Sequence, residues 1–311
     1  MVSQQIAKTV QRMESPEMRA VLTIQSHILK ATADFMFERK VLQLMPVIIS
    51  PVTDPLCHSV FDAQIDYYGQ KFFLTKSMIL HKQVSLIPKD RKAIYIVSPN
   101  VRLEKKELAA TGRHLIEFSQ VDFEFKDAES KEVMGFMEEL TTHIFGFVSE
   151  HCKAELETLG RDLKIPRSPF KVYDSDELRE KYGADFEHVV SLSSKEPFWI
   201  VSYCREFYDR EDPSRPGKYL NYDLVYPEGF GEALSGGERE HEYERVLAAM
   251  KKRGMSPGAL EFYLSLAKSG LLPKSAGAGF GVERMVRYIS GIKDIGDVSL
   301  FAKKPGEKVM F

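Results

Sequence analysis

Cysteine is scarce in this chain, which has only three among 311 residues: Cys57, Cys152 and Cys204. They lie far apart, and none belongs to a C-x-x-C pair. This excludes a disulfide framework and a structural zinc site built from paired cysteines. Such sparse cysteine usage is typical of a reducing compartment, so we expect a cytoplasmic protein.

Long apolar runs and an excess of basic residues are also missing. No stretch of 18 apolar residues occurs and the N-terminus has no signal-peptide pattern, so the sequence predicts no membrane segment. The 43 lysines and arginines are balanced by 45 acidic residues, which gives a net charge of −2. No basic tract exceeds a lysine pair, which argues against a protein that grips long nucleic acid.

What remains is the composition of an ordinary globular enzyme, with 43% hydrophobic and 28% charged residues. Apolar periodicity predicts helices over 19–40, 78–87 and 131–158, and strands over 41–50, 93–104 and 116–125. Further helices are expected around 237–253 and 257–269. Strands mixed with helices without regular alternation predict an α+β fold around a largely antiparallel sheet. We expect an N-terminal polar segment over 1–18 and a single domain over 19–311.

The stretch "SAGAGFGVERMVRYISG" at 275–291 places Gly277, Gly279 and Gly281 directly before a predicted helix that carries Arg284. The spacing is neither G-x-G-x-x-G nor a Walker loop, because no G-K-[ST] follows. Glycines before a helix N-terminus can approach a phosphate closely, and they can equally form a tight packing corner between strand and helix. The stretch alone leaves both interpretations open.

A second stretch, "RHLIEFSQVDFEFKD", separates into two faces by strict alternation. Val121, Phe123 and Phe125 point one way, whereas the opposite face carries an aromatic ring, an amide and two acids: Phe118, Gln120, Asp122 and Glu124. The second face could simply be solvated. Arg102 and Glu104 share one face of the preceding strand, so adjacent strands would bring guanidiniums, a ring and carboxylates onto one surface.

These motifs resemble motifs 2 and 3 of the class II aminoacyl-tRNA synthetases, namely "VRLE…GRHLIEF" with "VDFEF", and "AGFGVER". "LTKSMILHKQ" and "YPEGFGEALSGGERE" resemble the amino-acid and metal segments of the aspartyl/asparaginyl branch. The match runs from about residue 20 to the C-terminus, without the oligonucleotide-binding barrel of that branch. The chain is therefore similar to the archaeal asparagine synthetases related to asparaginyl-tRNA synthetase.

The resemblance implies an ATP site on the antiparallel sheet. Arg102 and Arg284 would be the catalytic residues, with Arg102 on the α-phosphate and the attacked carboxylate. Phe118 and Arg284 would enclose adenine. The full set of implied ATP-binding residues is Arg102, Glu104, Arg113, His114, Phe118, Gly281 and Arg284.

The resemblance also implies a metal site and a substrate site. Glu232 and Ser235 would bind Mg²⁺, a hard cation that takes oxygen ligands. The aspartate-binding residues would be Ser77, Lys82, Asp122, Asp223 and Arg239. The chain departs from the family at Lys303, in "FAKKPG", and at Lys76, and both departures affect the expected substrate geometry.

On this basis we expect an AMP-forming aspartate–ammonia ligase that uses ATP and Mg²⁺. It would make asparagine from aspartate and ammonia through β-aspartyl-AMP. We expect a homodimer, with the N-terminal helix and the following strand at the interface, and regard tRNA as an unlikely partner. The alternatives are an amino-acid-activating enzyme of the asparaginyl/aspartyl-tRNA synthetase type that acts on tRNA, and a non-catalytic paralogue that senses amino acid or adenylate.

Overall fold

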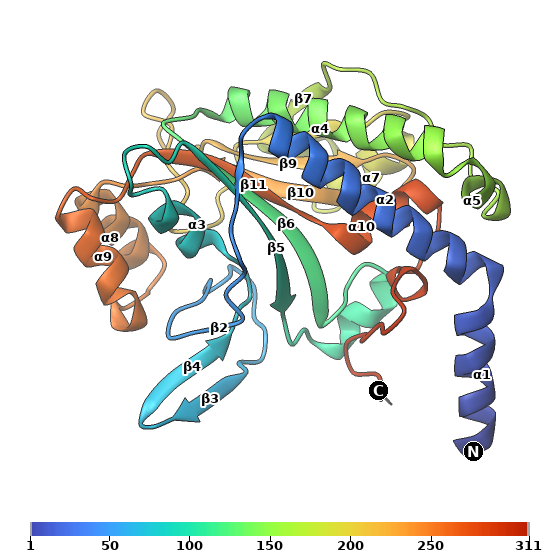
Figure 1. The fold of residues 1–311 in the computed structure, drawn as a ribbon. Coiled ribbons are helices and arrows are strands. Elements are labelled where there is room, and N and C mark those ends of the chain that lie inside the picture. Colours follow the sequence, from blue (N-terminus) through green and yellow to red (C-terminus); the bar gives the residue numbers. More distant parts are fainter. Residues whose placement is uncertain (1, 310–311) are drawn as a thin grey trace.

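The computed structural model describes residues 2–309, and within them an eight-stranded sheet has the order β1-β5-β6-β11-β10-β9-β8-β7 (Figure 1). The two outermost pairs, β1 with β5 and β7 with β8, are parallel, and the inner pairs are antiparallel. The strands in this order are Leu42–Gln43, Ala93–Val101, Glu117–Lys126, Ser275–Gly281, Gly231–Glu238, Asn221–Tyr226, Phe198–Val201 and Lys171–Asp174. This confirms the predicted α+β fold around a mainly antiparallel sheet.

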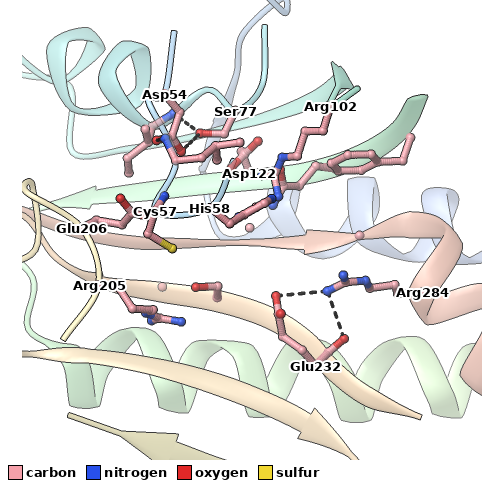
Figure 2. Close-up of a pocket in the computed structure, with 18 of the residues that line it drawn as sticks. Asp54, Cys57, His58, Ser77, Arg102, Asp122, Arg205, Glu206, Glu232 and Arg284 are labelled. Carbon is pink, nitrogen blue, oxygen red and sulfur yellow. Dashed lines mark hydrogen bonds and ion pairs between the residues drawn. The ribbon is translucent and has the colours of Figure 1, made fainter. Parts of the chain in front are cut away.

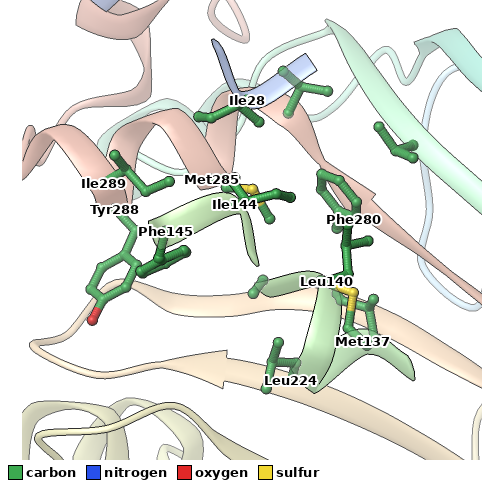
Figure 3. Close-up of a cluster of buried hydrophobic side chains, with 14 of the residues drawn as sticks. Ile28, Met137, Leu140, Ile144, Phe145, Leu224, Phe280, Met285, Tyr288 and Ile289 are labelled. Atoms are coloured by element: carbon green, nitrogen blue, oxygen red, sulfur yellow. The ribbon is translucent and has the colours of Figure 1, made fainter. Parts of the chain in front are cut away.

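One face of the sheet is covered by α2 (Pro16–Glu38), α4 (Ser130–His151) and α10 (Val282–Ser290). In Figure 1, α2 and α4 cross this face side by side. The helix α2 begins where Ser15 accepts a hydrogen bond from the Met18 amide, with proline in its first turn. Figure 3 shows the resulting core, in which Ile28 of α2 and Ile144 of α4 pack near Phe280 of β11.

The remaining helices surround this two-layer core. They are α1 (Val2–Glu14), α3 (Ile79–Ser85), α5 (Lys153–Thr158), α6 (Ser175–Tyr182), α7 (Phe186–Ser193), α8 (Tyr243–Lys252) and α9 (Glu261–Lys268), with 3-10 turns over Lys106–Thr111, Gly258–Leu260 and Ile295–Val298. A small sheet of β2 (Ile49–Ser50), β4 (Gln70–Leu74) and β3 (Gln64–Tyr67) projects below α3 in Figure 1. No helix within residues 2–309 has the length and apolar character needed to cross a bilayer.

Several predicted elements differ from the structure. Residues 41–50 form no continuous buried strand. They contain only the short strands β1, which pairs with β5, and β2, which pairs with β4, and Met45 between the two is 85% exposed. The helix predicted from residue 237 begins at Tyr243, since 237 and 238 still belong to β10. The helix predicted over 131–158 breaks at Cys152 into α4 and α5. The boundary that we expected between residues 18 and 19 falls inside α2, near its N-terminus.

The three alternating glycines lie inside a strand, β11, which pairs with β6 on one side and β10 on the other. A Cβ on Gly277 would lie 2.1 Å from Oε2 of Glu124, and one on Gly279 would lie 2.5 Å from Oδ1 of Asp122. The missing side chains therefore make room for the carboxylates of β6 in the neighbouring strand. The sheet face away from α2 and α4 can hold several acidic side chains for this reason.

Candidate active site

A pocket lies on the sheet face opposite the helices, and nearly all predicted site residues line it. Thirteen of the fourteen do so: Ser77, Lys82, Arg102, Glu104, Arg113, His114, Phe118, Asp122, Glu232, Ser235, Arg239, Gly281 and Arg284. The alternation on β6 produces this arrangement, because Val121 and Phe123 are in the core while Phe118 and Asp122 face the pocket. The polar face of β6 is therefore a site wall rather than a solvated surface.

Asp223 is the exception. Its carboxylate is buried on β9 beside Ser235 of β10, and both of its oxygens accept hydrogen bonds from Arg205 at 2.7 Å. Burial and the nearby Glu232 raise the pKa of Asp223 to about 6, against the opposing effect of Arg205. Its side chain thus holds Arg205, which does line the pocket.

The guanidiniums of Arg102, which follows β5, and Arg284, which lies in α10, both line the pocket (Figure 2). Arg284, in the first turn of α10, lies 3.1 Å from Oε1 of Glu232. Arg102 donates from Nε to the Lys76 carbonyl at 3.0 Å, and its Cζ lies 5.2 Å from the centre of the Phe118 ring. A planar ring and two cations within one pocket are suited to a nucleotide.

Glu104 and His58 meet at the mouth of this region. Nε2 of His58 lies 3.1 Å from Oε1 of Glu104, and the second oxygen of Glu104 is buried without a partner. Burial opposes ionisation, but the hydrogen bond to His58 and the nearby basic side chains, Arg102 among them, outweigh it and keep the pKa of Glu104 below its ordinary value. The unpaired oxygen is available to a ligand that brings a hydrogen-bond donor.

His114 and Arg113 follow on the loop after the 3-10 turn. Burial and the nearby Arg284 lower the pKa of His114 to about 4, so its imidazole is neutral at pH 7. Arg113 lies 3.5 Å from Oε1 of Glu187 on α7, and the same oxygen accepts a hydrogen bond from the Glu232 amide at 3.2 Å. Burial and the nearby Glu232 raise the pKa of Glu187 to about 7.

Two buried ion pairs lie at the other end of the pocket, which Lys82, Asp122 and Arg239 line, while Glu124 is fully buried next to Arg239. Nζ of Lys82 lies 2.9 Å from Oδ1 of Asp122, and Nε of Arg239 lies 3.0 Å from Oε1 of Glu124. All four side chains are less than 5% exposed. Both cations already have a carboxylate partner, so this end of the pocket can offer donors and acceptors together without excess charge.

A loop that precedes β3 closes the pocket from the side, as Figure 2 shows for Asp54, Cys57 and His58. Asp54 accepts from Ser77 at 2.8 Å and from Tyr208 at 3.2 Å, and the Cys57 amide donates to Glu206 at 3.1 Å. Burial and the nearby Asp54 raise the pKa of Glu206 to about 7. This corner carries a surplus of carboxylates, which favours a cationic ligand group.

Glu232 and Ser235 lie three residues apart on β10 and both line the pocket. Burial opposes ionisation of Glu232, but Arg284 and further guanidiniums hold the pKa of its carboxyl below the ordinary value. One carboxylate and one hydroxyl fit Mg²⁺ that arrives with phosphate oxygens and water. No cluster of three or more His, Cys, Asp or Glu side chains within the described part of the chain could hold a metal unaided.

The prediction missed several lining residues, among them Gln120, Arg205, Glu206, Tyr208 and Asp209. Most of them lie in the loop between β8 and β9, which has no periodic pattern from which a buried face could be read. Gln120 was visible on the polar face of its strand but received no role. The only available signal was its place between Phe118 and Asp122.

Comparison with known proteins gives a consistent result. The family described as "tRNA synthetases class II (D, K and N)" matches residues 2–305. An asparagine–tRNA ligase of Pelotomaculum thermopropionicum is 31% identical over 93% of this chain and 70% of its own length. The corresponding ligase of Pyrococcus abyssi is 29% identical over 94% of this chain and 70% of its own length.

Solved structures agree. The asparaginyl-tRNA synthetase of Pyrococcus horikoshii, complexed with asparaginyl-adenylate, superposes with a TM-score of 0.86 at 27% identity, over 95% of this chain and 71% of that one. The Entamoeba histolytica enzyme in complex with asparaginyl-adenylate, 20% identical, shares the fold over 99% of this chain and 72% of that one, with a TM-score of 0.85. The predicted class II catalytic fold is thereby confirmed.

The same comparisons correct one expectation. We regarded tRNA as an unlikely partner because the chain has no basic excess. That expectation is wrong, since relatives matched over more than nine-tenths of the chain are asparagine–tRNA ligases. Net charge is a poor guide here, because a local surface can bind RNA within a chain whose total charge is near zero.

Proposed function

The chain belongs to the class II tRNA synthetases of the D, K and N type, and on that premise we propose that it activates asparagine with ATP and transfers it to tRNA. The relatives named above are asparagine–tRNA ligases, which supports this activity over the aspartate–ammonia ligation that the sequence suggested. Mg²⁺ would accompany ATP.

One observation carries the proposal. Arg102, Phe118 and Arg284 share a single pocket with the Lys82–Asp122 pair and with Arg239, whose carboxylate partner Glu124 is fully buried outside the lining. The first group suits a nucleotide, and the two pairs suit a small polar side chain. A pocket that binds both at once can bring a carboxylate to the α-phosphorus, and such alignment supplies much of the rate of adenylate formation.

In this proposal the α-carboxylate of asparagine attacks the α-phosphorus of ATP. A new oxygen–phosphorus bond forms, the bond to the bridging oxygen breaks, and pyrophosphate leaves. Arg102 and Arg284 would stabilise the charge that develops on the phosphoryl oxygens. Mg²⁺ on Glu232 and Ser235 would neutralise charge on the leaving phosphates. A ribose hydroxyl of tRNA would then attack the acyl carbon, releasing AMP and a proton.

The paired cations support an amide side chain over a carboxylate. Lys82 and Arg239 are both neutralised, so an aspartate side chain would meet the Asp122 carboxylate without a free cation to pair with. An asparagine amide needs one acceptor and one donor, which these pairs offer. The surplus of carboxylates at Asp54 and Glu206 would hold the α-ammonium group.

Transfer of labelled asparagine to tRNA tests this proposal. Purified protein receives Mg-ATP, labelled asparagine and total tRNA of the source organism, and acid-precipitable label is counted. We expect label on tRNA that depends on ATP and is lost in Arg284→Ala. Production of free asparagine and AMP from aspartate and ammonium without tRNA would contradict it and favour the synthetase. Absence of any AMP or pyrophosphate release would favour a sensor.

A further inference from the structure

A series of buried hydrogen bonds, which we call the relay, runs beside the pocket from Lys82 to Gln120. Lys82 pairs with Oδ1 of Asp122 at 2.9 Å, and Oδ2 of Asp122 lies 3.1 Å from Oγ of Ser98. Nδ2 of Asn100 lies 3.3 Å from that Oγ and 3.0 Å from Oε1 of Gln120. Ser98 and Asn100 are completely buried. Only Gln120, Asp122 and Lys82 reach the pocket.

The Lys82–Asp122 pair fixes which group donates and which accepts in every hydrogen bond of this series. Asp122 is a carboxylate opposite an ammonium group, so it can only accept, and Ser98 must donate its single proton to it. The Ser98 oxygen is then left with acceptor capacity alone, which requires the amino group of Asn100 beside it. The second proton of that amino group requires an oxygen on Gln120. The amide of Gln120 must therefore turn its NH₂ away from Asn100.

The alternative orientation of Asn100 costs more. As it stands, its Oδ1 is buried without a hydrogen-bond partner. An amide turned by 180° would place two unpaired N–H donors there and would set its oxygen against the Ser98 oxygen. Each unpaired buried polar group is destabilising, so one orphaned acceptor is the smaller loss. The structure therefore keeps the Asn100 oxygen unpaired because the Asn100 NH₂ group is needed to bond both Ser98 and Gln120.

The NH₂ group of Gln120 lies over the glycine strand on the pocket floor. Its Nε2 is 2.6 Å from the position that a Cβ on Gly279 would occupy, and Gln120 stands between Phe118 and Asp122 on β6. Phe118 belongs to the nucleotide end and Asp122 to the amino-acid end. A donor between them faces the junction of the two substrates.

We propose that Asn100 and Ser98 are positioning residues that fix the Gln120 amide with its NH₂ toward the oxygens of the acyl–phosphate junction. The inference rests on the proposed adenylate chemistry for its consequence, though not for its geometry. An acceptor at this place would oppose the negative oxygens of the reacting groups. The relay makes the polarity of the pocket depend on side chains that never touch a substrate.

A double-mutant cycle tests the relay, with Gln120→Met as the second site. Asn100→Asp offers only oxygens to Gln120, so the Gln120 amide turns and presents its own oxygen to the pocket. We expect asparagine-dependent ATP–pyrophosphate exchange to slow about 100-fold in kcat, with the Kd for ATP within about twofold of wild type. In the Gln120→Met background, Asn100→Asp should have no further effect on kcat. An equal effect in both backgrounds would mean that Asn100 is merely structural, and would overturn the proposal.

Ser98→Ala is the milder variant if Asn100→Asp does not fold. It removes the acceptor that orients Asn100, so kcat should fall by about tenfold or less, and again only when Gln120 is present. A loss that persists in Gln120→Met contradicts the relay. Unchanged kcat in Ser98→Ala with Gln120 in place contradicts it too.

A separate readout distinguishes failure of the relay from failure of the proposed function. The Gln120 side-chain amide resonance, assigned by its loss in Gln120→Met, should shift in Asn100→Asp because its protons acquire a carboxylate partner. No shift overturns the relay whatever the enzyme does. A shift together with wild-type protein that shows no exchange with any amino acid refutes the proposed function and leaves the relay standing.

Discussion

Arg284 and Glu232 form an ion pair at 3.1 Å in the pocket, and each would exchange the other for a new partner when a nucleotide binds. Glu232 would turn to a metal ion and Arg284 to phosphate. Such pairing means that the guanidinium of Arg284 has a carboxylate to balance its charge. At the scale of single residues, much of the pocket is self-neutralised in this way, as Lys82 with Asp122 and Arg239 with Glu124 also illustrate.

Removal of either catalytic arginine should therefore affect rate more than folding. Arg102→Ala and Arg284→Ala are each expected to slow ATP–pyrophosphate exchange by about 100-fold or more, because a transition-state contact of this kind contributes about 3–4 kcal/mol. Arg245→Ala, on the exposed surface of α8, is the matched control and should be neutral. Near-normal exchange in Arg102→Ala or Arg284→Ala would show that the nucleotide binds elsewhere.

Raised carboxyl pKa values predict how the stability of the folded protein changes with pH. Burial and the nearby Asp54 raise the pKa of Glu206 to about 7, above its unfolded value. The folded state then holds a proton that the unfolded state releases, so this stabilisation is present below about pH 4.5 and is lost as pH rises through about 7. The melting temperature should fall across this window, and Glu206→Gln should flatten the fall. An identical slope in Glu206→Gln and in the exposed control Glu244→Gln would contradict this origin.

At the scale of elements, β11 and β6 depend on each other. The glycines of β11 leave room for the acids of β6. A side chain added to β11 would therefore collide with the carboxylates of β6 unless β6 changed as well. Gly277→Ala should destabilise the protein by about 2–3 kcal/mol, because its Cβ would collide with the Glu124 carboxylate and the Phe123 carbonyl. Urea denaturation measures this.

The control for that experiment is Gly135→Ala in α4. A Cβ there meets nothing within 4 Å, and the position is an exposed helix interior. The substitution should stabilise the protein by about 0.5–1 kcal/mol through helix propensity. If Gly277→Ala were as harmless as Gly135→Ala, close packing of β6 and β11 would not be the reason for the glycines.

The same elements show what a sequence can predict here. Strict alternation in β6 correctly assigned Val121 and Phe123 to the core and Asp122 to the opposite face, because a strand has a period of two. The glycines of β11 gave no such pattern, since residues without side chains have no periodicity. Strand β7 and helix α7 are short and were missed, although α7 contributes Glu187 beside Arg113.

The sequence predicted the site residues that belong to motifs. It did not predict the site residues that lie in loops. Arg205 and Glu206 reach the pocket because the long loop between β8 and β9 folds back over it. Only tertiary packing determines that path. Asp223 was predicted to touch substrate, but its place beside Arg205 depends on strand register, which the sequence does not give.

At the scale of the whole molecule, the end of α2 and the segment after it expose large apolar side chains. Phe37 is 83% exposed, Met45 85% and Ile48 57%, within twelve residues of one another. Such a patch suits a protein partner, and we expect a second copy of the chain to cover it. Met45→Glu should shift the protein from dimer to monomer in analytical ultracentrifugation. Phe262→Glu, at a 75% exposed position on α9, should leave the dimer intact. A wild-type monomer, or equal dissociation by both variants, would contradict this interface.

The central claim is that this pocket joins an amino acid to ATP, and amino-acid-dependent ATP–pyrophosphate exchange measures that step directly. Protein, Mg-ATP and labelled pyrophosphate are incubated without tRNA, with asparagine in one reaction and with aspartate and ammonium in another. We predict label in ATP with asparagine, little with aspartate, and exchange slowed by about 100-fold or more in Arg284→Ala. Exchange or steady AMP release confined to aspartate, with free asparagine as the product, would contradict the account.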